Sequence, residues 1–155
     1  QRLNAARIPT IVITNQAGIG RGYYGWKDFH LTQKAIDQAL ALAGAHTDAL
    51  WACAYHPDGL GPYAADHPFR KPNPGMLLDA SSLLAIDLLN SSVIGDKLSD
   101  LEAGLNAGLR RLFLVRTGYG ADHESQLPAY PRLSPHVQVA GTLLEAVEAI
   151  ISRGL

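Results

Sequence analysis

The chain has 155 residues, of which 47% are hydrophobic and 17% are charged, and its formal net charge is −1 at pH 7. This length suits one ordinary domain, and the near-neutral charge lacks the basic excess that attracts nucleic acid or lipid, so we expect neither as a partner. No apolar run reaches the roughly 18 residues of a membrane helix, and the first residues do not resemble a signal peptide. The single cysteine, Cys53, excludes an internal disulfide and suits a reducing compartment. We therefore expect a soluble cytoplasmic protein, and we separately expect it to be a monomer.

The first third of the chain predicts a strand between two helices. Residues 3–7 read as the end of a helix, and residues 8–14 form a β-branched run typical of a parallel strand buried on both faces. Residues 15–22 contain three glycines, which predict either a loop whose backbone approaches a ligand or a plain turn. Helical spacing of apolar residues then predicts an amphipathic helix over 26–43, ended by Gly44.

The middle of the chain predicts a strand, a long loop and a helix. Residues 48–55 form the strand, and residues 56–74 form an irregular stretch with five prolines, long enough to indicate function or disorder. Arg70 and Lys71 directly precede a helix that begins near Met76. Cations at a helix start oppose the helix dipole, so we expect an anionic partner to offset them.

The second half continues the alternation of strands and helices. The elements predicted there are a strand over 92–96, a helix over 99–107 ended by Gly108, a strand over 110–116, a region without periodicity over 117–135, a strand over 136–139 and a helix over 142–151. Such alternation predicts an α/β fold with a doubly wound, mostly parallel sheet and helices on both faces.

Charged residues follow the strand over 92–96. Asp96 and Lys97 come directly after it, at the end of a strand where ligands bind in α/β proteins. An ionised carboxylate accepts hydrogen bonds only and suits a hard cation such as Mg²⁺. The alternative is purely structural, with Ser99 as a helix N-cap and Asp100 favouring the helix N-terminus.

Four stretches in this order resemble one enzyme superfamily. They are Thr-Asn-Gln-Ala-Gly-Ile-Gly-Arg-Gly over 14–22, Arg-Lys-Pro-Asn-Pro-Gly-Met-Leu over 70–77, Gly-Asp-Lys-Leu-Ser-Asp over 95–100 and Val-Arg-Thr-Gly over 115–118. Together they resemble the haloacid dehalogenase (HAD) superfamily of phosphotransferases, and within it the heptose bisphosphate phosphatase and histidinol-phosphatase group. The resemblance covers about residues 8–118 and implies a HAD-like Rossmannoid fold.

The resemblance implies a Mg²⁺-dependent phosphatase, in which an aspartate attacks phosphorus and water hydrolyses the aspartyl-phosphate. By position, Thr14 and Lys71 would hold the phosphoryl oxygens, Asp96 would bind Mg²⁺ and Asp100 would support this loop. The substrate-binding residues implied are Thr14, Asn15, Gln16, Ala17, Arg21, Arg70, Lys71 and Lys97. The implied substrate is a small sugar phosphate, D-glycero-D-manno-heptose 1,7-bisphosphate, with histidinol phosphate as the alternative. A phosphate-binding or scaffolding module without catalysis is the alternative of another class.

The first motif of the superfamily is missing from the pattern. The family begins with an Asp-x-Asp strand that supplies the nucleophile, and no such motif occurs before Thr14. Without that central strand, the neighbouring buried strands would leave backbone groups unpaired. We therefore expect residues 1–155 to be one HAD-like phosphatase domain that is incomplete at its N-terminus, with the nucleophile before Gln1, and we expect these residues alone to be inactive.

Zinc is a second departure from the pattern. Relatives with a structural zinc place Cys-x-His and Cys-x-Cys before the lysine motif, where this chain has Cys53, Tyr55, His67 and Phe69. His56 and Asp66 could complete only an unorthodox set, and a structural zinc requires four ligands. We expect Mg²⁺ as the cofactor and no zinc.

Overall fold

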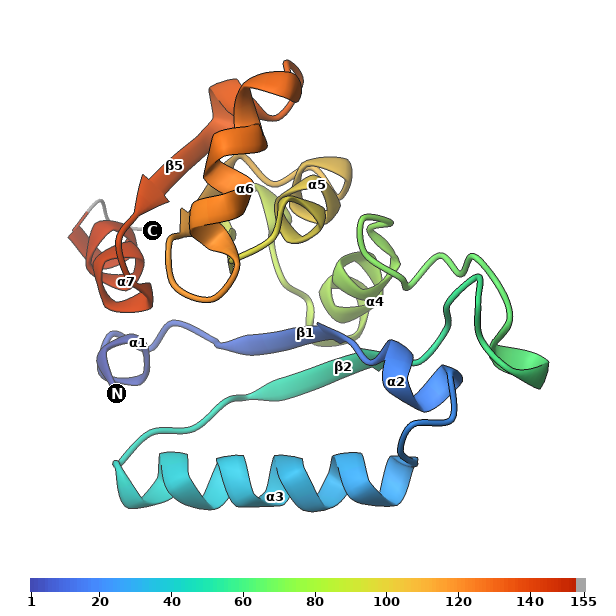
Figure 1. Ribbon diagram of the computed structural model, residues 1–155. Helices are drawn as coiled ribbons and strands as arrows, with labels where there is room; N and C mark the ends of the chain where they lie inside the picture. The colour runs from blue at the N-terminus through green and yellow to red at the C-terminus, as the bar shows by residue number, and fades with distance from the viewer. Residues whose placement is uncertain (153–155) are drawn as a thin grey trace. The chain divides into compact units, whose positions relative to one another are not determined.

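The computed structural model describes residues 1–152, and these form two compact units, Gln1–Arg70 and the described residues from Lys71 onward. Each unit combines parallel strands with helices (Figure 1), so the predicted α/β class is confirmed. Among the described helices, none is both long and apolar enough to span a membrane.

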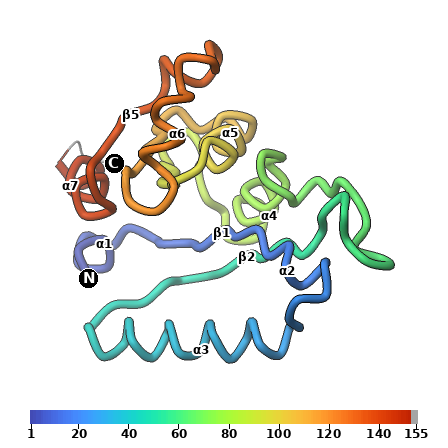
Figure 2. Tube along the Cα trace, viewed as in Figure 1, coloured from blue at the N-terminus to red at the C-terminus, as the bar shows by residue number. Residues whose placement is uncertain are grey.

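The first unit is built on a two-stranded parallel sheet. β1 (Ile11–Asn15) pairs with β2 (Ala49–Cys53), with the first residues of the two strands opposite each other. The other elements are α1 (Arg2–Ala5), α2 (Ala17–Gly20), α3 (Trp26–Leu42) and the short 3-10 helix η1 (Gly61–Tyr63). α3 runs along the sheet (Figure 2). Its Phe29 joins Ile19 and Ala54 in the core of this unit.

Two features of this unit differ from the sequence prediction. The predicted loop over 15–22 contains the helical turn α2, because Ile19 turns into the core. A Cβ on Gly20 would overlap the Ala54 carbonyl, so this glycine serves packing within the unit. β1 is half-buried along its length rather than buried on both faces, since β2 is its only neighbour in this unit's sheet among the described residues.

The second unit is built on a three-stranded parallel sheet. Its strands are β3 (Ser92–Gly95), β4 (Arg111–Val115) and β5 (Val137–Ala140), in the spatial order β3-β4-β5. The helices are α4 (Gly75–Leu84), η2 (Leu88–Asn90), α5 (Leu98–Asn106), α6 (Gly120–Gln126), η3 (Leu127–Ala129), η4 (Ser134–His136) and α7 (Leu143–Ser152). α5 packs on β3 and β4, and α7 packs on all three strands.

The central strand β4 is covered on both faces. Leu112 and Leu114 belong to one core cluster with Leu98 and Leu101 of α5. Successive side chains of a strand point to opposite faces, and the alternate residues Phe113 and Val115 are also buried. Both faces of β4 are therefore buried, as is typical of a strand in a parallel sheet.

In the second unit, two sequence predictions are corrected by the structure. The predicted irregular region over 117–135 contains α6, η3 and η4, which apolar periodicity does not reveal because most side chains of α6 are polar. The N-cap of α5 is Lys97 and not Ser99, because the Asp100 carboxylate accepts a hydrogen bond from the Lys97 backbone N–H at 3.2 Å.

Candidate active site

The ends of β3 and β4 bring two loops to one edge of the sheet. Their parallel register places Gly95 opposite Leu114, so residues 96–97 and 116–120 leave the sheet side by side. A Cβ on Gly95 would lie 2.5 Å from the Asp100 Cβ, so the chain can turn into α5 here only because residue 95 has no side chain. This edge carries Asp96, Lys97 and Asp100, as the sequence predicts from the strand end.

Asp96 is half-buried and is oriented by the neighbouring loop. Its Oδ2 accepts a hydrogen bond from the Tyr119 backbone N–H at 3.1 Å, and Gly118, at φ +66°, lies against the same oxygen. Within residues 1–152, its Oδ1 accepts no hydrogen bond. Mg²⁺ is commonly bound by one or two carboxylates together with waters and substrate phosphates, so this carboxylate fits the ion.

Lys71 and Asp100 form an ion pair that is mostly shielded from solvent. Lys71 Nζ lies 2.8 Å from Asp100 Oδ1, and the two side chains are 14% and 13% exposed. Asp100 is therefore the anionic partner that the sequence predicts for the cation before α4. Asn106 of α5 also donates to the Pro72 carbonyl at 3.1 Å, which fastens the same segment to α5.

Lys97 lies over an aromatic ring. Its Nζ is 4.2 Å from the centroid of the Tyr119 ring, within the range of a cation–π contact. Lys97 is exposed, and Tyr119 is 59% exposed. Tyr119 thus contacts both Asp96 and Lys97.

In the first unit, Thr14 is the next-to-last residue of β1 and lies beside a short chain of hydrogen bonds. The Thr14 hydroxyl accepts from Gln16 Nε2 at 2.9 Å, and Gln16 Oε1 accepts from the Tyr24 hydroxyl at 2.6 Å. The Gln16 backbone N–H donates to the Cys53 carbonyl at 2.7 Å, so both the backbone and the side chain of Gln16 are held by hydrogen bonds within the first unit. A hydroxyl that accepts one hydrogen bond still has its own proton to donate, which leaves Thr14 able to bind an anionic oxygen.

In the first unit, the predicted residue Arg21 lies beside His56. One nitrogen of Arg21, Nη2, lies 2.8 Å from His56 Nε2 and 3.4 Å from Asp58 Oδ2. Burial of the ring, followed by the positive charges of Arg70 and Arg21, lowers the pKa of His56, and Asp58 opposes the shift. This shift disfavours the protonated ring, and the Nδ1 of His56 accepts a hydrogen bond from the Asp58 backbone N–H at 3.0 Å.

Arg70 is fastened to the loop that precedes it. Its Nη1 donates to the Tyr55 carbonyl at 3.2 Å, and its backbone N–H donates to the His67 carbonyl at 2.8 Å. These contacts hold both the backbone and the guanidinium of a residue that sequence reasoning assigns to the substrate.

Aromatic rings occupy the loop that carries zinc ligands in some relatives. The His67 ring stacks on Tyr55 at 4.0 Å, and Phe69 meets His67 edge-on at 5.3 Å. Cys53 is buried, and burial raises the pKa of its thiol, which disfavours the thiolate that binds metals. Within residues 1–152, no group of three or more His, Cys, Asp or Glu side chains is arranged to hold a metal ion.

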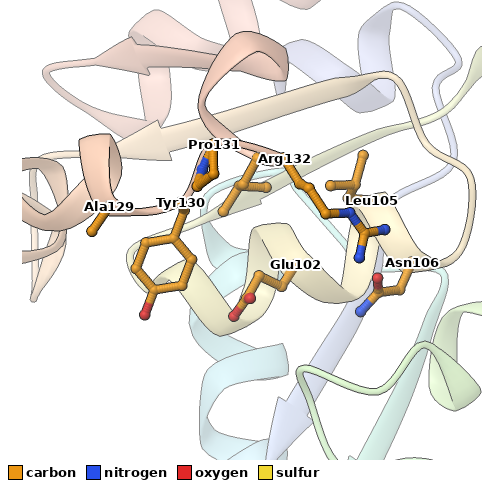
Figure 3. A pocket seen from close by; sticks show the side chains of 8 residues that line it. Glu102, Leu105, Asn106, Ala129, Tyr130, Pro131 and Arg132 are labelled. Carbon is orange, nitrogen blue, oxygen red and sulfur yellow. The ribbon is translucent and has the colours of Figure 1, made fainter.

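A cavity of about 220 Å³ lies elsewhere in the second unit. Figure 3 shows Tyr130 and Arg132 extending toward α5, with the Arg132 guanidinium near Asn106. The lining residues are Glu102, Leu105, Asn106, Ala129, Tyr130, Pro131, Arg132 and Leu133. None of them is a predicted site residue.

Sequence reasoning missed Tyr119 and the ring cluster. The signal for Tyr119 is positional: it follows Gly118 at the end of β4, the strand that pairs with β3. The ring cluster has a weaker signal, namely the alternation of Tyr55, His67 and Phe69 with prolines in the long loop.

Comparison with known proteins gives a consistent result. The family model described as HAD-hydrolase-like matches residues 68–146. The chain is 50% identical over 113 residues to a D-glycero-β-D-manno-heptose-1,7-bisphosphate 7-phosphatase of Mesorhizobium japonicum, covering 72% of this chain and 52% of that protein. It is 45% identical over 107 residues to a D-glycero-α-D-manno-heptose-1,7-bisphosphate 7-phosphatase of Burkholderia mallei, covering 68% of this chain and 57% of that protein. The chain thus spans little more than half the length of these curated relatives.

Solved structures agree with the sequence comparisons. A HAD-like phosphatase from Mesorhizobium loti superposes with a TM-score of 0.82 at 38% identity, covering 99% of this chain and 71% of that one. The D,D-heptose 1,7-bisphosphate phosphatase of B. bronchiseptica, complexed with magnesium and phosphate, gives a TM-score of 0.87 at 29% identity, covering 99% and 79%.

Proposed function

Because this chain belongs to the HAD-like hydrolase family, we propose that the protein is a magnesium-dependent phosphatase that acts on a small sugar bisphosphate. The observation that carries the proposal is the loop after β3. There one Asp96 carboxylate oxygen accepts no hydrogen bond from the part of the chain that the structure describes, and Asp100 in the following helix holds the Lys71 ammonium. Phosphoryl transfer depends mostly on positioning and charge neutralisation, which this set of groups suits.

Each residue has a part in the proposed reaction. Lys71 neutralises a phosphoryl oxygen, and Asp100 keeps its ammonium in place. The Thr14 hydroxyl donates a hydrogen bond to the phosphoryl group, and Gln16 fixes the direction of that hydroxyl. Mg²⁺ bound at Asp96 would supply further positive charge to the phosphoryl oxygens. Asn15, Ala17, Arg21, Arg70 and Lys97 are the proposed contacts to the rest of the substrate.

The nucleophile of this proposal is an aspartate outside these residues. Residues 1–14 contain no aspartate or glutamate, and the curated relatives are longer than this chain. The proposed chemistry is attack of that carboxylate on phosphorus, release of the sugar alcohol and hydrolysis of the aspartyl-phosphate by water.

D-glycero-D-manno-heptose 1,7-bisphosphate is the proposed substrate, and its 7-phosphate is the group removed. The support comes from relatives that are 50% and 45% identical and whose names give the β and α anomers. We further propose a cytoplasmic monomer in which these 155 residues belong to one phosphatase domain. The elution volume of the purified protein in size-exclusion chromatography tests the monomer.

Phosphate release by the complete protein tests the proposal. The substrates are both anomers of the heptose bisphosphate and histidinol phosphate, each with Mg²⁺ and with excess chelator. We expect release from a heptose bisphosphate that stops with chelator and returns with added Mg²⁺. Faster release from histidinol phosphate would overturn the substrate, and binding of phosphate esters without release from any of them would support the scaffolding alternative. The chain of residues 1–155 alone is the control, for which we expect no turnover.

A further inference from the structure

Tyr119 links two predicted site residues through two different parts of its structure. Its backbone N–H donates to Asp96 Oδ2 at 3.1 Å. Its ring lies 4.2 Å from Lys97 Nζ. A change of the side chain alone can therefore remove the contact with Lys97 and leave the hydrogen bond to Asp96 in place.

The backbone around Tyr119 is fixed from both sides. Gly118 has φ +66°, and a Cβ there would overlap Asp96 Oδ2. A Cβ on Gly120 would overlap the Val115 carbonyl. The Arg116 guanidinium makes two hydrogen bonds to the Glu124 carboxylate, at 2.6 and 2.8 Å, which joins the end of β4 to α6. The loop thus fixes the backbone from which the Tyr119 side chain extends.

Lys97 needs such a support because its own surroundings do little to hold it. Its side chain is exposed and flexible, and fixing a lysine in one position costs rotamer entropy. Its backbone N–H is held by Asp100, which orients the start of the side chain and not its end. The Tyr119 ring contacts the ammonium itself.

We propose that Tyr119 is a positioning residue that holds the Lys97 ammonium at the carboxyl edge of β3, where it binds the phosphorylated substrate. The inference rests on the proposed function and adds Tyr119 to it. Lys97 faces a charge that the substrate carries both before and during the reaction. Removal of the Lys97 ammonium therefore weakens substrate binding without slowing the chemical step. Tyr119 should therefore affect KM and leave kcat nearly unchanged.

The contact itself can be read by NMR without any activity. In lysine-labelled protein, the Lys97 ε-methylene protons should be shifted upfield by the ring current of Tyr119, with Lys97→Arg providing the assignment. The shift should persist in Tyr119→Phe, which keeps the ring, and disappear in Tyr119→Leu. Tyr23→Leu, at a tyrosine that is 76% exposed, is the control and should leave the shift unchanged. Equal Lys97 shifts in the wild type and in Tyr119→Leu would overturn the proposal.

Steady-state kinetics test the effect of the Tyr119–Lys97 contact on substrate binding. In the complete protein, Tyr119→Leu should raise KM about two- to five-fold, the range of an exposed cation–π contact, with kcat nearly unchanged. Tyr119→Phe should restore the wild-type KM, and Tyr119→Leu should add nothing in a Lys97→Ala background. A fall in kcat shared by the Leu and Phe variants would show a structural role and overturn the proposal.

Titration with inorganic phosphate separates this inference from the proposed function. The dissociation constant for phosphate should rise by the same two- to five-fold in Tyr119→Leu. If the wild-type protein releases no phosphate from any substrate, the proposed function fails, and this titration together with the NMR shift still decides the role of Tyr119. An unchanged dissociation constant in Tyr119→Leu would overturn that role.

Discussion

Lys71 Nζ lies 2.8 Å from Asp100 Oδ1, and this pair joins the segment before α4 to the first turn of α5. Its two partners are 29 positions apart in the sequence, and both are mostly removed from water. Asp100 also accepts from the Lys97 backbone N–H, so a single carboxylate organises two lysines of the candidate site.

Breaking this pair on one side should destabilise the protein. Lys71→Met and Asp100→Leu each leave one charge without its partner in a poorly solvated place, and each should lower the free energy of unfolding by about 3 kcal/mol. The double variant should lose clearly less than the sum, because it leaves no unpaired charge. Urea denaturation followed by circular dichroism measures the free energy of unfolding of the two single variants and of the double variant. Additive losses would contradict a direct interaction between the two side chains.

Removing the charges of the site should lower activity strongly. In the complete protein, Lys71→Ala and Asp96→Asn should each lower kcat/KM by on the order of a hundredfold or more, as the loss of preorganised charge does. Steady-state phosphate release measures this effect, and circular dichroism checks that each variant is folded. Near wild-type activity in either variant would remove that residue from the proposed mechanism.

His56 should make stability depend on pH. Burial, Arg70 and Arg21 hold its pKa below the ordinary 6.5, so the unfolded chain binds the proton more readily than the folded one. The stabilisation is therefore complete above pH 6.5 and is lost as the pH falls toward the depressed pKa of the folded state. Denaturation midpoints measured between about pH 5 and pH 8 should fall on the acid side, and His56→Gln should flatten this fall. The same acid loss in wild type and variant would refute the assignment to His56.

The loop between β2 and α4 should be held by rings and not by zinc. A zinc chelator should leave the thermal midpoint of unfolding unchanged. His67→Gln should lower the free energy of unfolding by about 1 kcal/mol, because it removes the stack on Tyr55. His136→Gln, at an exposed histidine, should have no such effect. A fall in the midpoint on chelation, restored by added zinc, would contradict this prediction.

The sequence by itself determines the order of strands and helices and the chemistry at the strand ends. Unbroken apolar runs predict β1 and β4, and Gly44 and Gly108 mark helix ends correctly, both at positive φ. Asp96 and Lys97 stand out because charges directly follow a strand, and in a parallel sheet such positions face ligands. These signals are local, so a single sequence carries them.

Tertiary structure alone decides which of these residues meet. The Lys71–Asp100 pair depends on how α5 packs against the segment before α4, and the Lys97–Tyr119 contact depends on the pairing of β3 with β4. α6 is invisible to periodicity because its polar side chains show no apolar stripe. Gly20 is explained by the Ala54 carbonyl 34 positions away. Contacts between distant positions come from packing, and no local pattern in the sequence records them.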